Sequence, residues 1–501
     1  MKRLVTGVVL SAALAAATLT GVSGPAAATP LNPIVWGACS DPTLVQGGAQ
    51  CGTLSVPLDH VLPFGTQITL ALSRVKHKSP DNAYQGVAVS LPDALSGTGV
   101  NQSLTGGRLP NGAGDTYDWV GFAPRGLAPS VPTLSCIPDY LDFNRSDYVT
   151  TTPAAEQVWL DRVKGYADAC AKNQPALLDH LKTTDKAADL ENIRAALGVN
   201  QLNLFGQSYG TYLGQVYATL FPSHVRRIVL DSNVNPSRVW YGAAAFDQAV
   251  PLENNLRLWF DWLASHDDVY HLGATRDAVT TTWNAQLAKL RVAPADGAVG
   301  PDEWADMMLF TPYFQSTWPI MGSAFANYVR TGDGVPLKAM FSQFLQHGND
   351  NVLANELAQV CTDAPWPANW SKWHNDSVAT DLKAPDTTWG NTWANAPCFF
   401  WHAKAGIPVR VNGYGVKSAL LVDETLDAAT PFEGSLEVRS RFPGASLVSV
   451  TGGTNNAGSL SGNTCVDSKI AAYFATGSLP ARKPGRQADV QCAPLPLPSP
   501  S

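Results

Sequence analysis

The stretch LNLFGQSYGTYLGQVYATL, residues 202–220, decides the fold because it joins a buried strand to a helix through one sharp turn. A short apolar run precedes the turn. After it, Leu213, Val216, Tyr217 and Leu220 recur with the spacing of one helix face. The stretch therefore predicts a strand, a tight turn and a helix in direct succession.

The turn carries the pattern G-x-S-x-G, with Gly206, Ser208 and Gly210 at its fixed positions. Such a turn crowds the residues beside the serine, so glycine is needed two places before and two places after it. The pattern alone also occurs in ordinary glycine turns. The strand before it and the helix after it favour a nucleophile turn over an ordinary one. We expect Ser208 to be an exposed nucleophile and the backbone N–H of Tyr209 to be an oxyanion donor.

Length and composition indicate one α/β core enlarged by an insertion. The chain has 501 residues, of which 45% are apolar and 15% are charged, enough for a sizeable core. Its net charge of −7 argues against nucleic acid or an anionic membrane as partner. We expect a monomer that binds a peptide substrate or ligand and needs no cofactor or metal.

The amino terminus has the anatomy of a secretory signal peptide. Lys2 and Arg3 precede an apolar run, and small residues end near Ala28. An uncleaved anchor is the alternative, but the apolar run is short for a bilayer and is diluted by alanine and threonine. We expect residues 1–28 to be cleaved near Ala28 and the protein to be secreted, without stable membrane insertion.

The cysteines form an even set, which in an exported chain favours disulfides over free thiols or zinc. Pairing of sequence neighbours closes the shortest loops and is the connectivity we expect, although sequence alone does not fix it. The expected pairs are Cys39 with Cys51, Cys136 with Cys170, Cys361 with Cys398, and Cys465 with Cys492.

Strand and helix patterns alternate on both sides of a long interruption, which predicts a mostly parallel sheet covered by helices on both faces. We assign residues 29–235 and 406–492 to this core, residues 236–405 to a helical cap, and residues 493–501 to a disordered Pro/Ser tail. Expected strands are residues 52–58, 68–75, 87–91, 117–122, 227–230, 418–422 and 446–450, and expected helices include 154–171 and 187–197.

The expected cap is rich in aromatic residues, since twelve of the fifteen tryptophans lie within residues 236–405. Aromatic rings above an active site could grip an apolar or proline-rich ligand. They could equally form the hydrophobic core of the cap itself, and we favour this second interpretation.

An acidic partner for Ser208 should follow a late strand of the sheet. Asp427 lies shortly after the strand expected at residues 418–422, where a carboxylate could orient an imidazole. Asp423 and Glu424 lie closer to the strand end and are less suitable. A solvated surface role for Asp427 is the alternative.

Several short motifs occur in order along the chain: residues 117–122 with 124–126, 189–190 with 193–194 and 197–198, 208–213, 221–222, 427 with 430–431 and 433–434, and 462–463 with Cys465. Together they resemble the secreted tripeptidyl aminopeptidase family of α/β-hydrolases, which is related to the proline iminopeptidases. The resemblance implies the α/β-hydrolase fold with an inserted helical cap. It also implies an exported serine exopeptidase that releases short peptides from free amino termini.

The chain departs from this family in the loop after the third strand. The family carries Pro-Gly-Gly-Pro-Gly-Gly-Ser-Gly there, whereas residues 92–99 read PDALSGTG. Side chains at Asp93, Ala94 and Ser96 would strain or obstruct a loop that needs glycine. Ala94 is the expected second oxyanion donor.

The second departure concerns the catalytic base. Its histidine should follow the strand at residues 446–450, but that turn reads GGTNNAG, with Asn456 at the matching position. All nine histidines precede Asp427, and His402 is the last of them. Asparagine cannot accept the serine proton, and loss of the base costs on the order of a million-fold in turnover, or about 8 kcal/mol.

Three hypotheses follow. The chain is a serine peptidase or esterase acting through Ser208, or a non-catalytic relative that binds a peptide or another ligand in the retained pocket. In the third, a cap group such as His402, or the substrate itself, supplies the base.

Overall fold

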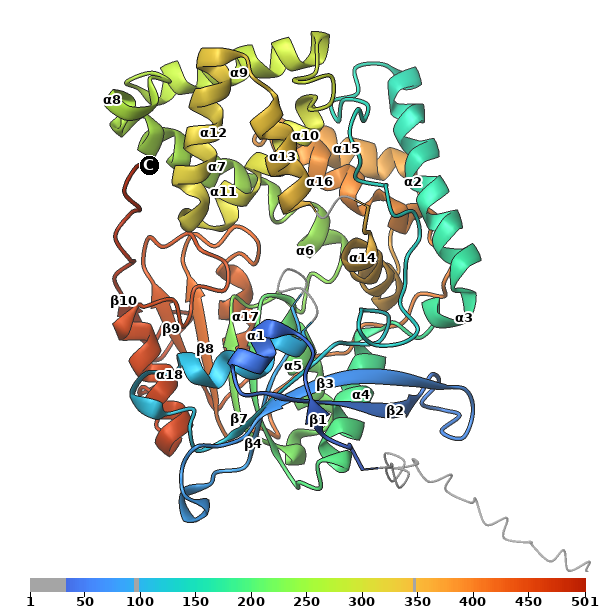
Figure 1. Cartoon of the computed structure of the whole chain (residues 1–501), viewed down its shortest axis with the longest axis vertical. Helices are drawn as coiled ribbons and strands as arrows, with labels where there is room; N and C mark the ends of the chain where they lie inside the picture. The colour runs from blue at the N-terminus through green and yellow to red at the C-terminus, as the bar shows by residue number, and fades with distance from the viewer. Residues whose placement is uncertain (1–32, 94–98, 346–347) are drawn as a thin grey trace, which may run out of the picture.

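A single mixed sheet organises the chain in the computed structural model, which describes residues 33–93, 99–345 and 348–501 (Figure 1). The strand order is β1-β2-β3-β5-β4-β6-β7-β8-β9-β10. Pairs β1–β2, β2–β3 and β3–β5 are antiparallel, and the other neighbours run parallel, as expected. The strands are β1 (Gly37–Ala38), β2 (Gln50–Pro57), β3 (Gln67–Val75), β4 (Val87–Ser90), β5 (Asp118–Phe122), β6 (Leu202–Gln207), β7 (Val225–Asp231), β8 (Ala419–Glu424), β9 (Ala445–Val450) and β10 (Val490–Cys492).

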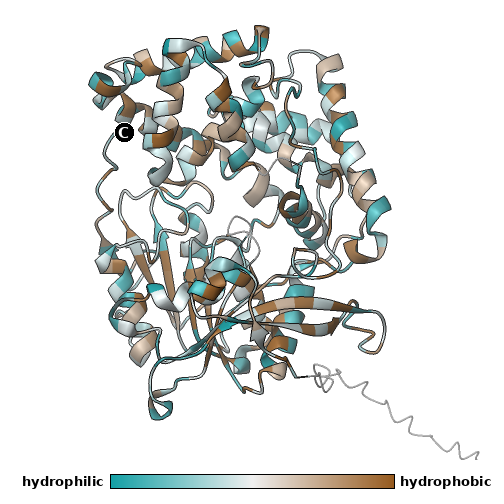
Figure 2. Cartoon of the chain, in the orientation of Figure 1, coloured by the Kyte–Doolittle hydropathy of each residue, from teal (hydrophilic) through white to brown (hydrophobic). Residues whose placement is uncertain are grey.

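The central strands are apolar on both sides because helices cover both faces. On one face, Leu204 of β6 packs in a cluster with Leu190 and Val216 of two covering helices. On the other, Phe205 of the same strand packs in a cluster with Phe474. Figure 2 shows hydrophobic residues concentrated in the strands of the sheet. Each such side chain contributes about 1.5–3 kcal/mol when fully buried.

The core helices begin and end at recognisable signals. Thr152 caps α2 with a bond from the N–H of Ala155, and Asn463 caps α18 in the same way. The helices outside the cap are α1 (Pro42–Gln46), η1 (Asp81–Ala83), η2 (Val100–Arg108), η3 (Pro110–Gly112), α2 (Pro153–Asn173), α3 (Pro175–Leu178), α4 (Thr183–Ala196), α5 (Tyr209–Leu220), η4 (Pro222–His224), α17 (Glu433–Arg441) and α18 (Thr464–Thr476).

Between β7 and β8 the chain forms a layer of helices that lies over the carboxyl ends of the parallel strands (Figure 1). Its helices are α6 (Tyr241–Ala245), α7 (Ala249–Ser265), α8 (Asp267–Tyr270), α9 (Arg276–Val292), α10 (Pro301–Met308), α11 (Phe310–Tyr313), η5 (Gln315–Thr317), α12 (Trp318–Thr331), α13 (Val335–Phe344), α14 (Asn351–Asp363), α15 (Trp370–Asp381), α16 (Thr388–Asn395) and η6 (Ala396–Phe400). We call this layer the cap.

Five of the twelve cap tryptophans form a core within the cap, and the others pack against the sheet side or against α2. Trp259, Trp283, Trp304 and Trp318 are almost completely buried in one cluster of α7, α9, α10 and α12. Trp240 differs, since it lines a cavity between the cap and the sheet. The aromatic enrichment is therefore mainly structural.

Four disulfides join sequence neighbours: Cys39–Cys51, Cys136–Cys170, Cys361–Cys398 and Cys465–Cys492. This is the connectivity expected from the shortest loops. Disulfides of this number are typical of proteins that mature in an oxidising compartment. No helix within the described ranges is both long and apolar enough to cross a bilayer. The expected signal peptide, residues 1–28, lies outside the described residues.

The carboxyl-terminal tail differs from our expectation of disorder. It runs from β10 along the cap (Figure 1), where the indole of Trp262 donates to the carbonyl of Pro498 over 3.0 Å. The hydroxyl of Ser323 donates to the carbonyl of Ser501 over 2.6 Å. A Pro/Ser segment has no core of its own, but cap side chains supply the hydrogen-bond partners that its composition does not reveal.

Candidate active site

Ser208 stands at the bend between β6 and α5, as the sequence predicts. Its backbone has φ 50° and ψ −124°, a strained conformation for a residue other than glycine. The Ser208 N–H donates to the carbonyl of Asp231 at the end of β7 over 3.0 Å, which fixes the bend against the sheet. The serine is half-buried and lines a cavity, so its hydroxyl faces the space where a substrate would lie.

The two glycines of the motif are required by close backbone contacts. A Cβ at position 206 would lie 2.7 Å from the carbonyl oxygen of Gly210. A Cβ at position 210 would lie 3.2 Å from the carbonyl oxygens of Leu91 and Pro92. A side chain at position 206 would therefore force a backbone shift. A side chain at position 210 would make a tight contact that its neighbours must relieve by a small movement.

The cavity above Ser208 has a volume of about 660 Å³ and lies between the sheet and the cap. Segments after β4, β6, β7 and β8 form its floor, and α6, α11, α14 and α16 form its walls. Its position at the carboxyl edge of the parallel strands is the usual place for ligands in α/β proteins. We call it the Ser208 cavity.

Asp427 follows β8 and is held in a dense set of hydrogen bonds. Its Oδ1 accepts from the backbone N–H groups of Ala429 and Thr430 at 2.8 and 3.0 Å, and its Oδ2 accepts from the Thr430 hydroxyl at 2.9 Å. Burial raises the pKa of Asp427 to about 6, although these hydrogen bonds act to lower it. The carboxylate is thus ionised at neutral pH and is placed to orient a partner.

That partner is Asn456. Its Nδ2 donates to Oδ2 of Asp427 over 3.0 Å and to Oγ1 of Thr430 over 3.0 Å. The reverse amide orientation would set an oxygen against a carboxylate, so the donor assignment follows from chemistry. The next carbonyl, that of Ala457, accepts from Gln207 over 2.9 Å, and this bond places the turn beside the elbow. The three residues predicted for the triad positions thus come from adjacent segments at one edge of the sheet.

The other two late carboxylates do not take part. Asp423 and Glu424 end β8, and they bond instead to Ser435 and Asn455. Burial raises the pKa of Glu424 to about 7. Both residues belong to the strand itself rather than to the loop after it. Their closeness to the strand end in the sequence predicted that they would be less suitable than Asp427.

No histidine of the described residues lines the Ser208 cavity. Six of the eight described histidines bond through the ring to other groups: His60 with Asp189, His77 with Asp118, His224 with Glu191, His266 with the Trp262 carbonyl, His374 with Glu156 and His402 with Asp168. His402, the candidate substitute base, lies 2.6 Å from Asp168 of α2 on the surface. The ninth, His347, lies outside the described residues.

The oxyanion donors are described in part. Tyr209 is the first residue of α5, so its N–H has no partner within the helix and lies at the positive end of the helix dipole. Ala94, the expected second donor, lies outside the described residues, as does Ser96. Asp93 lines the Ser208 cavity.

Sequence reasoning missed Glu356, a residue of α14. Its side chain is accessible and lines the Ser208 cavity. Burial raises the pKa of Glu356, and the charge of Lys186 opposes this rise. With the described residues, the Glu356 carboxylate makes neither a hydrogen bond nor an ion pair. No motif surrounds it in the sequence.

Other charged residues of the cavity are already partnered. Arg238 pairs with Asp247 at 2.6 Å, and Glu433 pairs with Arg486. Lys186 donates to Oδ1 of Asn355 over 3.0 Å and to the side-chain oxygen of Gln359. Burial lowers the pKa of Lys186 to about 8.

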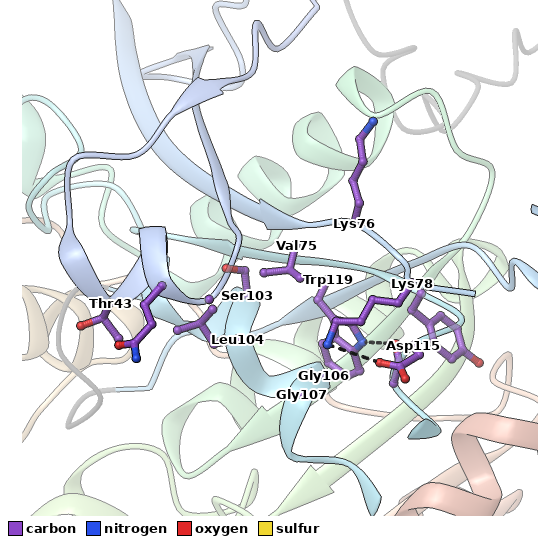
Figure 3. A pocket seen from close by; sticks show the side chains of 14 residues that line it. Thr43, Val75, Lys76, Lys78, Ser103, Leu104, Gly106, Gly107, Asp115 and Trp119 are labelled. Atoms are coloured by element: carbon purple, nitrogen blue, oxygen red, sulfur yellow. Dashed lines mark hydrogen bonds and ion pairs between the residues drawn. The ribbon is translucent and has the colours of Figure 1, made fainter. Parts of the chain in front are cut away.

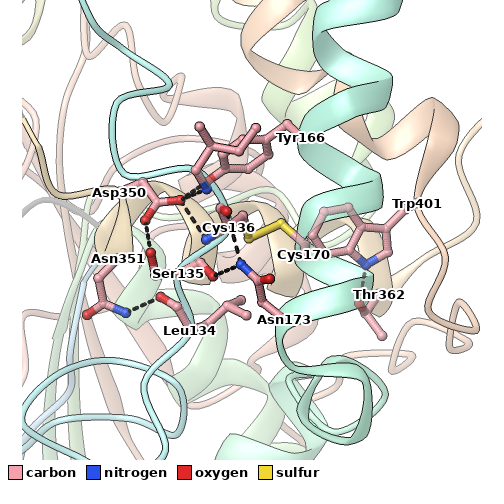
Figure 4. The surroundings of a disulfide bond; sticks show 11 residues. Leu134, Ser135, Cys136, Tyr166, Cys170, Asn173, Asp350, Asn351, Thr362 and Trp401 are labelled. Carbon is pink, nitrogen blue, oxygen red and sulfur yellow. Dashed lines mark hydrogen bonds between the residues drawn. A yellow bond between two sulfur atoms is a disulfide. The ribbon is translucent and has the colours of Figure 1, made fainter.

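Helix α14 is anchored at both ends, which fixes the position of Glu356. Before its first turn, the Asp350 carboxylate accepts from the hydroxyls of Ser135 and Tyr166 and from the Cys136 N–H, beside the Cys136–Cys170 disulfide (Figure 4). Near its last turn, Cys361 forms a disulfide with Cys398.

A separate hollow of about 400 Å³ lies on the side of β3 and η2 and shares no lining residue with the Ser208 cavity. Lys78 and Asp115 form an ion pair of 3.7 Å at its edge (Figure 3). The described residues place no nucleophile with a base there, so this hollow offers no alternative chemistry.

Comparison with known proteins identifies the chain. A family model described as "alpha/beta hydrolase fold" matches residues 109–291, and one described as "TAP-like protein" matches residues 384–492. The tripeptidyl aminopeptidase of Streptomyces coelicolor is 36% identical over 480 residues, covering 93% of this chain and 87% of that protein. The chain belongs to the tripeptidyl aminopeptidase family of α/β-hydrolases.

Two further relatives of this chain have other names. Serine protease Hip1 of Mycobacterium tuberculosis is 27% identical and covers 90% of each chain. Carboxylesterase B of the same organism is 28% identical, covering 96% of this chain and 95% of that protein. The relatives of this chain are thus named as serine peptidases and a carboxylesterase, and the present chain is a serine hydrolase by its family. The resemblance predicted from the sequence is confirmed.

Proposed function

We propose that this chain is a secreted serine hydrolase of the tripeptidyl aminopeptidase type that binds short peptides by their free amino termini, with slow turnover because Asn456 replaces the general base. The observation that carries the proposal is the unpaired carboxylate of Glu356 in the same cavity as Ser208. Four disulfides support an exported protein.

Glu356 favours a cation as its partner. A carboxylate in a cavity pays a desolvation cost that a bound ammonium group offsets through charge and hydrogen bonds. The nearby Lys186 ammonium does not fulfil this role, because it donates to Asn355 and Gln359. A peptide whose amino terminus binds Glu356 would extend through the cavity towards Ser208.

The chemistry at Ser208 would then follow from the geometry. The Ser208 oxygen attacks a carbonyl carbon, the peptide bond breaks with release of the leaving amine, and the developing oxyanion is stabilised by the Tyr209 N–H. The proton of the serine hydroxyl must pass, through water, to the leaving amine in this step, and a second water then cleaves the ester on Ser208 to release the acyl group as a carboxylate. The Asn456 amide has no basic atom for the proton, so only positioning and oxyanion stabilisation remain.

A second candidate function is peptide binding without turnover. It is favoured by the closed network of Asp427, Thr430 and Asn456, in which both Nδ2 hydrogens of Asn456 are used. In this case the pocket is retained for recognition alone.

Binding of Ala-Pro-Ala-type peptides tests the proposal. By calorimetry, the free-amino peptide should bind at least about thirtyfold more tightly than its acetylated form, and Glu356→Gln should abolish that difference. Glu433→Gln is the matched control, since Glu433 lies in the same cavity but is paired with Arg486. Equal binding of free and acetylated peptides would contradict the proposal.

Turnover separates the two candidates. Slow release of product from a chromogenic Ala-Pro-Ala peptide that disappears in Ser208→Ala supports the hydrolase. Tight binding with no difference in product release between the natural protein and Ser208→Ala supports the binding protein.

A further inference from the structure

A second cavity adjoins the Ser208 cavity inside the cap. Its volume is about 280 Å³, and it lies between α2, α10, α11, α14 and α16. The two cavities share six lining residues: Leu309, Tyr313, Leu353, Glu356, Asn391 and Ala394. Glu356 therefore stands at the junction of the two spaces.

The walls of the second cavity are largely aromatic, and we call it the aromatic cavity. Trp159 of α2 stacks on Trp393 of α16 with ring centroids 5.5 Å apart. Tyr140, Phe310 and Phe314 complete the rings that line it. Such a surface gains free energy by enclosing apolar groups and gives little hydrogen bonding to a polar one.

The carboxylates of the aromatic cavity other than Glu356 are paired, and Arg162 is the cavity cation without a carboxylate partner among the described residues. Arg145 bonds to Glu303 and Asp306 at 3.1 and 2.7 Å. Asp386 accepts from the Trp283 indole at 2.9 Å and pairs with Arg257. Arg162 donates to the carbonyl of Tyr140 and lies over two aromatic rings. The cavity thus leaves one unpaired carboxylate, Glu356, at its entrance, with mostly aromatic walls beyond it.

We infer that the aromatic cavity binds the side chain of the first residue of the peptide and selects large apolar or aromatic residues there. The inference rests on the proposed function. An ammonium group held by Glu356 places the first Cα at the junction, where the side chain can enter the aromatic cavity while the chain continues towards Ser208. The volume suits one large side chain.

Peptides X-Pro-Ala with X as Gly, Ala, Leu or Phe test the inference by calorimetry on the Ser208→Ala protein, in which no turnover occurs. Phe at the first position should bind about tenfold to a hundredfold more tightly than Gly. Equal affinities for all four peptides would overturn the inference.

Ala394→Phe provides the matched variant. Ala394 lies on α16 at the junction and is open to the cavity, so a phenyl ring there would block the entrance while leaving Glu356 in place. The variant should lose the preference for Phe over Gly, whereas Ala394→Ser should keep it. An undiminished preference in Ala394→Phe would overturn the inference.

Acetylated peptides distinguish this inference from the proposed function. If free-amino peptides bind more tightly than acetylated ones but the first side chain has no effect, the aromatic cavity is not a specificity site and the proposed function stands. If acetylation has no effect, the anchor at Glu356 is absent and both fail.

Discussion

The side-chain amide of Asn456 lies 3.0 Å from Oδ2 of Asp427 and donates a hydrogen bond to it. An imidazole at this place would donate one hydrogen to the carboxylate and keep a basic nitrogen for Ser208. Asn456 instead donates its second hydrogen to Thr430. The orienting carboxylate and the nucleophile are thus retained around a group that cannot accept a proton.

Labelling of Ser208 by a fluorophosphonate should show the missing base in its pH dependence. Without an imidazole, the labelling rate should rise steadily with pH and show no inflection near pH 6.5, where histidine titrates. In Asn456→His the same measurement should show an inflection in that region. An inflection near pH 6.5 in the labelling of the natural protein would indicate that another histidine serves as base, and Ser208→Ala should show no labelling at any pH.

Substitution of Gly206 by alanine should distort the elbow. The new Cβ would lie 2.7 Å from the carbonyl oxygen of Gly210, so the backbone must shift at a cost of about 1–3 kcal/mol in unfolding free energy. Gly165→Ala is the control, because no atom lies within 4 Å of its Cβ position on α2, and it should stabilise by about 0.5–1 kcal/mol. Urea unfolding of both variants measures the difference, and equal stability would contradict the contact.

Peptide binding at Glu356 should pass through a maximum with pH. The carboxylate must be ionised to hold an ammonium group, and burial raises its pKa, so affinity should increase with pH over the acidic side of the profile, beginning above the ordinary range of glutamate. Above about pH 8 the peptide amine deprotonates and affinity should fall. In Glu356→Gln the profile should be flat over the acidic limb. Calorimetry of one free-amino peptide across this range provides the test.

Stability should decline as pH rises from 5 to 8. Burial raises the pKa of Glu424 to about 7 and that of Asp427 to about 6. In this window the unfolded chain has released protons that the folded chain still holds, so the free energy of unfolding falls as pH increases. The decrease should be on the order of 3 kcal/mol. Unfolding midpoints at both pH values measure it, and Glu424→Gln should flatten the slope.

The elbow and the disulfides were open to prediction because each depends on local chain geometry. Residues 202–220 contain the strand, the turn glycines and the helix face within one short stretch. The cysteines lie close enough in sequence for loop closure to favour neighbouring pairs. The order of strands along the chain likewise predicted that Ser208, Asp427 and Asn456 would meet at one edge of the sheet.

Glu356 and the carboxyl-terminal tail could not be predicted because their roles depend on contacts between distant segments. Glu356 is one charged residue in an ordinary helix until Asp350 and the Cys361–Cys398 disulfide fix α14 over the Ser208 cavity. The tail has the composition of a disordered segment, and Trp262, Tyr270 and Ser323 of the cap hold it in place.

The central claim is that the elbow carrying Ser208 is retained and that its general base is missing. The most direct measurement is kcat/KM for a chromogenic Ala-Pro-Ala peptide, compared between the natural protein and Asn456→His, with Ser208→Ala and the double variant as controls. We predict an increase of at least about a hundredfold in Asn456→His that requires Ser208. Equal kcat/KM in the natural protein and Asn456→His, at a level typical of an efficient peptidase and abolished in Ser208→Ala, would contradict the account.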